Sequence, residues 1–97
     1  MTVSAAFMVP HPPLIIPEVG RGGEKQILAT TNAYEKVAEE VAALKPDTII
    51  ITSPHSVMYA DYFHISPGHR ATGSFADFGA SGVRFSEEYD TELADAI

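Results

Sequence analysis

Two histidines each stand directly after a proline that closes a run of mainly apolar residues. His11 follows Pro10, and His55 follows Pro54. Imidazole nitrogens are common metal ligands, and the chain has no cysteine, so a metal ion here would need imidazole and oxygen ligands. Two neutral imidazoles suit Fe(II), Zn(II) or Mn(II). The pattern therefore predicts that His11 and His55 are two ligands of one metal ion.

The segments before the two histidines have the composition of buried strands. Residues 3–9 form a nearly continuous apolar run, and residues 48–52 read Thr-Ile-Ile-Ile-Thr, which is β-branched throughout. Between them, apolar residues recur at helical spacing over residues 24–44. This order predicts a right-handed βαβ unit with parallel strands. The expected fold class is α/β, with three layers and a mostly parallel sheet, and both histidines should share one rim of that sheet.

Each histidine also has a simpler interpretation, because a histidine after a proline in a loop is most often a turn residue. The placement of His11 and His55 at equivalent strand ends favours a shared metal site instead. His64 stands in the middle of a predicted strand, as a hydrogen-bonded structural histidine would. His69 lies in a predicted loop and is interpreted as a solvated residue.

Three loop carboxylates are candidates for a third ligand: Glu18, Asp61 and Asp77. One carboxylate beside two imidazoles would form the facial triad of non-haem iron oxygenases. A proline-stiffened segment separates Glu18 from His11, and Asp61 or Asp77 could equally cap a turn, so the residues favour none of the three strongly. The glycine-rich residues 20–23 lack the lysine and serine of a phosphate-binding loop and indicate a flexible start to the helix.

The second half of the chain predicts smaller elements. Residues 62–66 are expected to form a third short strand, and residues 67–82 a mobile loop. Ser86 is the predicted cap of a last helix, whose apolar stripe continues to Ile97 without a stop signal. We therefore expect residues 1–97 to be the N-terminal portion of a single larger domain, with uncovered apolar faces that favour a homo-oligomer or another association.

Composition restricts the choice of partners. The chain has 97 residues, 45% of them hydrophobic, which is enough for one small domain. Six basic and 13 acidic residues give a net charge of −7, which repels nucleic acid backbones and anionic membranes. The N-terminal apolar run ends at Pro10 and is too short for a signal peptide or a membrane span. The expectation is a cytoplasmic protein with neither nucleic acid nor membrane as a partner.

At the two Pro-His turns the chain resembles the catalytic B-subunit (LigB/Memo-like) superfamily of class III extradiol ring-cleavage dioxygenases. The matching segments are Ala5-Ala6-Phe7-Met8-Val9-Pro10-His11-Pro12-Pro13-Leu14, Ile50-Ile51-Thr52-Ser53-Pro54-His55-Ser56 and Tyr59-Ala60-Asp61-Tyr62-Phe63. The resemblance extends from Val3 to about Phe85 and so covers nearly the whole chain.

The resemblance implies that His11 and His55 are ligands of a mononuclear Fe(II) in an enzyme that cleaves a catechol-like aromatic substrate with O₂. In the dioxygenases a late glutamate completes the site and a further histidine acts as acid and base. Neither has a matching position within the 97 residues, so the resemblance implies a fragment without independent activity. The alternative is a Memo-like protein without oxygenase activity, which keeps the same cleft for binding or as a scaffold. The residues after Ile97 would distinguish the two.

Overall fold

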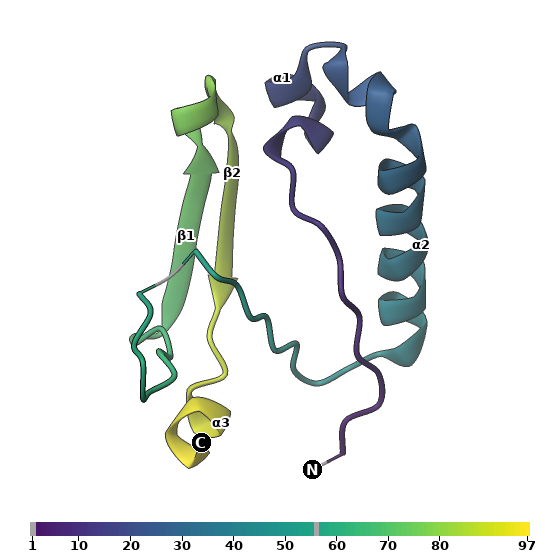
Figure 1. Ribbon diagram of the computed structural model, residues 1–97. Helices are drawn as coiled ribbons and strands as arrows, with labels where there is room; N and C mark the ends of the chain where they lie inside the picture. Colours follow the sequence, from purple (N-terminus) through teal and green to yellow (C-terminus); the bar gives the residue numbers. More distant parts are fainter. Residues whose placement is uncertain (1, 56) are drawn as a thin grey trace. The chain divides into compact units, whose positions relative to one another are not determined.

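The computed structural model describes residues 2–55 and 57–97, and it combines helices with a two-stranded antiparallel sheet (Figure 1). In chain order the main elements are α1 (Pro17–Gly20), α2 (Leu28–Leu44), β1 (Arg70–Phe75), β2 (Ala80–Glu88) and α3 (Thr91–Ala96). Short 3₁₀ helices occupy Pro13–Ile15, Gly23–Ile27 and Ala76–Phe78. The chain is therefore a mixed α/β structure, as the sequence predicts at this coarse level.

The chain divides into two compact units. The first comprises Met1–Asp47 and Ser74–Arg84, and the second comprises Thr48–Gly73 and Phe85–Ile97. His11 belongs to the first unit and His55 to the second.

The longest helix, α2, forms where the sequence predicts it. The 3₁₀ helix Gly23–Ile27 leads directly into α2, so together they match the predicted range of residues 24–44. Alanine, glutamate and leucine, which have high helix propensity, fill much of α2. Lys45 ends it in the left-handed conformation, with φ 49°, and donates its N–H to the carbonyl oxygen of Ala42 at 3.3 Å. Pro46 follows and prevents the helix from continuing.

The sequence predicts strands at residues 3–9, 48–52 and 62–66, but the structure does not form strands at these positions. None of these segments is a helix or a strand, and the sheet in the described residues is the β1–β2 pair. A helix satisfies its backbone hydrogen bonds within one segment, whereas a strand needs a second segment beside it. The helical spacing of apolar residues therefore predicted α2 correctly, whereas the composition of the three strand segments does not show which segment would pair with each of them.

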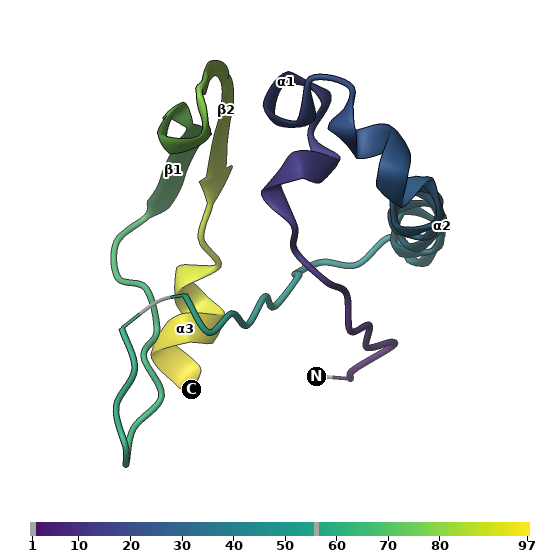
Figure 2. The ribbon, with the colours of Figure 1, turned by 45° about the horizontal axis from the view of Figure 1, so that its top comes forward.

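Residues 70–88 form a β-hairpin, where the sequence predicted a mobile loop over residues 67–82. β1 and β2 lie side by side in both views (Figures 1 and 2). In the turn, Gly79 has φ 78°, a conformation that glycine adopts without a steric cost, and donates its N–H to Ala76 at 3.0 Å. The loop prediction was wrong because small residues with weak strand propensity form this hairpin around a favourable turn.

The last helix begins later than predicted and has a different cap. Ser86 lies in β2, where its Oγ accepts a hydrogen bond from Arg70 at 2.7 Å. The observed cap is Asp90, whose Oδ1 accepts the N–H of Leu93 at 2.9 Å. Thr48 donates its hydroxyl to the second carboxylate oxygen of Asp90. The start of α3 is thus joined to residue 48 within the second unit.

Few of the described residues are buried. Among the described residues, Ala80 is the one buried apolar residue, with 7% of its surface exposed. Large β-branched side chains remain open to solvent, such as Ile49 at 62% and Ile51 at 84%. No helix within residues 2–55 and 57–97 has the length and apolar character needed to cross a bilayer. The described chain therefore presents much of its apolar surface uncovered.

Candidate functional site

His11 lies in backbone that prolines restrict on both sides. Pro10 precedes it and Pro12 follows it, and a proline fixes its own φ and disfavours a helical conformation in the residue before it. Pro12 is extended, with φ −74° and ψ 123°, and its carbonyl oxygen accepts the N–H of Ile15 at 3.1 Å. His11 itself is exposed. The backbone around this candidate ligand is thus stiff, and the side chain is accessible.

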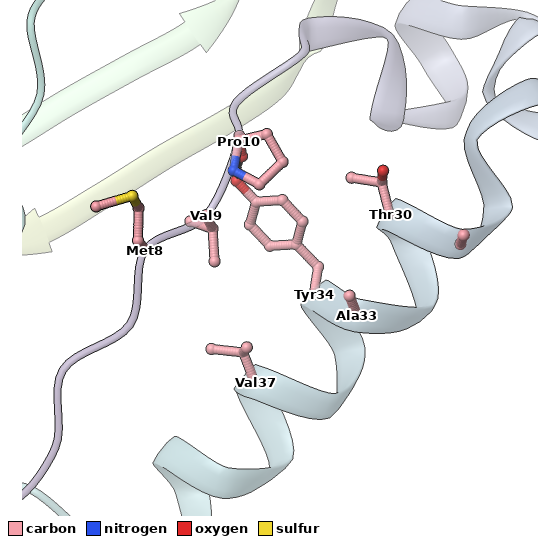
Figure 3. Close-up of a pocket in the computed structure, with 8 residues that line it drawn as sticks. Met8, Val9, Pro10, Thr30, Ala33, Tyr34 and Val37 are labelled. Carbon is pink, nitrogen blue, oxygen red and sulfur yellow. Dashed lines mark hydrogen bonds between the residues drawn. The ribbon is translucent and has the colours of Figure 1, made fainter.

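An apolar groove of about 300 Å³ lies directly beside this segment, within the first unit (Figure 3). Met8, Val9 and Pro10 line one side of it, and Ala33, Tyr34 and Val37 of α2 line the other. The hydroxyl of Tyr34 donates a hydrogen bond to the carbonyl oxygen of Pro10. This bond is not visible in the sequence, because Tyr34 fits the apolar face of the helix and no local pattern reveals a partner 24 residues away.

His55 lies in a turn of the second unit. Its backbone N–H donates to the Oγ of Ser53 at 3.2 Å, and this bond closes a short serine turn around Pro54. His55 is exposed. Ser56, which completes the Pro-His motif, lies outside the described residues. The structure therefore provides the turn at His55 but not the preceding strand that the sequence predicts.

The other two histidines have different surroundings from each other. His64 is exposed and in no strand, so its predicted role as a histidine in the middle of a strand is wrong for this structure. His69 is exposed and lies outside the strands, as predicted, directly before β1 at the base of the hairpin. Its carbonyl oxygen accepts the N–H of Tyr89 at 2.9 Å. Within residues 2–55 and 57–97, neither histidine belongs to a group of three side chains that could hold a metal ion.

The three candidate carboxylates lie on different elements. Glu18 is on α1, Asp77 is in the 3₁₀ helix of the hairpin turn, and Asp61 is in an irregular part of the second unit. Within residues 2–55 and 57–97, no three histidine, aspartate or glutamate side chains are grouped so that they could hold a metal ion. The described residues therefore do not form a complete metal site.

A backbone N–H of the glycine-rich segment before α2 already donates a hydrogen bond to a nearby side chain. Arg21 and Gly22 are both left-handed, with φ 49° and 99°, and the N–H of Gly22 donates to Glu24 Oε2 at 2.7 Å. A phosphate would need such an amide as a donor. The occupied amide supports the interpretation of residues 20–23 as the start of a helix.

The donor chemistry of the two candidate ligands fits a divalent metal ion. His11 and His55 both offer imidazole nitrogens from exposed turns that follow a proline. Imidazole suits Fe(II), Zn(II) and Mn(II) to different degrees, and oxygen ligands commonly complete such sites. Each of the two turns therefore carries a donor of the kind that such metal sites use.

Comparison with known proteins identifies the family. Residues 5–97, which include both Pro-His turns, match the family described as the catalytic LigB subunit of aromatic ring-opening dioxygenase. The chain is also 40% identical over 97 residues to Protein CA_C1420 of Clostridium acetobutylicum, and it spans 21% of the length of that protein. No solved structure matches the chain. Because the family match covers nearly all of its residues, the chain belongs to the LigB family of aromatic ring-opening dioxygenase subunits.

Proposed function

We propose that this chain is the N-terminal portion of an extradiol dioxygenase-like domain and carries two of its metal ligands, His11 and His55. The observation that chiefly supports the proposal is the family match over residues 5–97, which includes both Pro-His turns. The proposed metal is Fe(II), with Zn(II) or Mn(II) as alternatives of suitable ligand chemistry. The proposed substrates of the complete protein are a catechol-like aromatic compound and O₂.

In this proposal the chain supplies two metal ligands and the restricted backbone that positions them. His11 and His55 would each present a neutral imidazole nitrogen, and the prolines before them would limit the backbone freedom of each turn. When bound, the ion would supply a Lewis acid and a template for the aromatic substrate and O₂. The third ligand and the acid/base group would come from outside residues 1–97.

The proposal also includes the sheet that the sequence predicts. Residues 3–9 and 48–52 would pair as parallel strands in the complete protein, with His11 and His55 at the same rim. The exposed side chains of Ile49 and Ile51 support this, because β-branched residues are typical of strands covered on both faces. Such pairing would give those side chains the cover that they lack here.

The experiment that tests this function is a ring-opening assay on the full-length protein. The protein is loaded anaerobically with Fe(II), mixed with a panel of catechols, and then exposed to O₂. We expect the yellow ring-opened product from the wild type and from His69→Ala. We expect no product from His11→Ala or from His55→Ala, because each substitution removes a proposed ligand.

A second measurement on the same samples separates the oxygenase from the Memo-like alternative. Binding of catechol is followed in the absence of O₂. Iron uptake that depends on His11 and His55, with catechol binding but no ring opening of any catechol, would contradict oxygenase activity and favour a binding protein.

A further inference from the structure

We propose that Tyr34 is a positioning residue for His11: it fixes the orientation of the Pro-His turn relative to α2. The inference rests on the proposed role of His11 as a metal ligand. Its structural basis is the hydrogen bond that the Tyr34 hydroxyl donates to the carbonyl oxygen of Pro10. Figure 3 shows the Tyr34 side chain extending from α2 to Pro10, with its hydroxyl at that carbonyl.

The acceptor is well placed to orient His11. The carbonyl of Pro10 belongs to the same planar peptide unit as the backbone nitrogen of His11. A hydrogen bond that holds this oxygen therefore also sets the direction in which the chain enters His11. Proline restriction makes the turn stiff, but stiffness alone does not orient it relative to the rest of the unit.

The donor stands on a rigid support. Tyr34 lies within the 17-residue α2 and is half-buried. Its ring lines the apolar groove with Val9 and Val37, and a phenolic hydroxyl in apolar surroundings usually finds a hydrogen-bond partner. The ring and the hydroxyl thus have separate tasks: the ring packs in the groove, and the hydroxyl holds the turn.

Removal of one oxygen atom distinguishes positioning from packing. Tyr34→Phe keeps the ring in the groove and deletes the donor to Pro10. Tyr62→Phe is the matched control, because it deletes the same atom from a side chain that is 76% exposed in the second unit. Both variants are made in the full-length protein, and circular dichroism and thermal unfolding establish that each remains folded.

The first readout does not depend on a metal ion. Chemical shifts of the Pro10 carbonyl carbon and the His11 amide are measured by NMR in the metal-free protein. We expect both resonances to move in Tyr34→Phe and to stay in place in Tyr62→Phe. Unchanged resonances in a folded Tyr34→Phe would overturn the positioning role, whether or not His11 binds a metal.

The second readout is the affinity for Co(II) as a spectroscopic substitute for Fe(II), together with the visible spectrum of the bound ion. Loss of groups that orient metal ligands typically weakens affinity 10- to 100-fold, so we expect a dissociation constant about tenfold higher in Tyr34→Phe, with an altered spectrum. If His11→Ala lowers the affinity for Co(II), wild-type affinity and spectrum in Tyr34→Phe would overturn the inference. His11→Ala is measured in parallel: unchanged Co(II) binding in that variant would contradict the proposed function, while the metal-free NMR result would still decide the role of Tyr34.

Discussion

Gly20 is a position where the structure leaves no space for a side chain. A Cβ atom there would lie 2.5 Å from the carbonyl oxygen of Leu14 and 2.5 Å from Oε2 of Glu24. The Leu14 atom belongs to the backbone and yields less easily than a side chain. The same Glu24 oxygen accepts the N–H of Gly22, so its displacement would also cost that hydrogen bond.

We therefore expect Gly20→Ala to lower the free energy of unfolding by about 1–3 kcal/mol, the usual range for an overpacked position. Gly23→Ala is the control, because no atom lies within 4 Å of its added Cβ, and it should change stability by less than about 0.5 kcal/mol. Urea denaturation of the full-length protein measures both. Equal effects of the two substitutions would show that the close approach at Gly20 does not constrain the chain.

Residue types alone identify His11 and His55 as candidate ligands, because a histidine after a proline at the end of an apolar run is visible in the sequence. The contact between Tyr34 and Pro10 is not visible in this way, because it depends on how α2 packs against the N-terminal segment. The same limit applies to the third ligand, since three separate carboxylates had equal support from their sequence positions.

The start of α3 depends on one carboxylate with two donors. The hydroxyl of Thr48 and, to a smaller extent, the backbone N–H of Leu93 hold the pKa of Asp90 below its ordinary value of 3.8. The charged form of Asp90 is therefore favoured in the folded state. Its contribution to the stability of α3 is present above pH 3.8 and is lost as the pH falls through the lower folded pKa.

We expect Thr48→Val to raise the pKa of Asp90 toward 3.8, because it removes the larger of the two causes. Amide protection at Leu93 should then be lost at a higher pH than in the wild type. Thr52→Val is the control and should change neither property. NMR titration of the Asp90 carboxyl carbon and hydrogen exchange at Leu93 measure the two effects. An unchanged titration in Thr48→Val would show that this hydrogen bond does not govern the carboxyl.

Helices and the hairpin illustrate why some elements were predicted and others were not. The pattern for α2 is local and long, so its boundaries agree closely with the sequence. The cap of α3 was misplaced because Ser86 and Asp90 are both good cap residues, and the pairing of β2 with β1 decides between them. The hairpin was not predicted because Gly73, Gly79 and Gly82 have low strand propensity and so indicate a loop.

At the scale of the whole molecule, the dominant feature is apolar surface that no described residue covers. Ile49, Ile50 and Ile51 are all exposed and adjacent in the chain. Exposed apolar patches favour association when they are contiguous. Parallel strands at residues 3–9 and 48–52 were expected from composition, but a strand forms only with a partner strand, and composition does not supply one.

We expect the 97-residue chain alone to associate with itself in a concentration-dependent manner, as sedimentation velocity would measure. Ile51→Asp should weaken this association, because it places a charge at a side chain that is 84% exposed. Thr52→Asp introduces the same charge at the neighbouring polar position and should weaken it less. A monomer at all concentrations in the unmodified chain would contradict the expectation.

The most direct test of the proposed metal site is the iron content of the full-length protein after anaerobic loading with Fe(II) and removal of free metal. If His11 and His55 are ligands of one mononuclear site, elemental analysis should find about one iron per chain in the wild type and in His69→Ala. The double substitution His11→Ala with His55→Ala should abolish iron binding, and each single substitution should reduce it strongly. Iron content equal to that of the wild type in the double variant would contradict the assignment of both histidines.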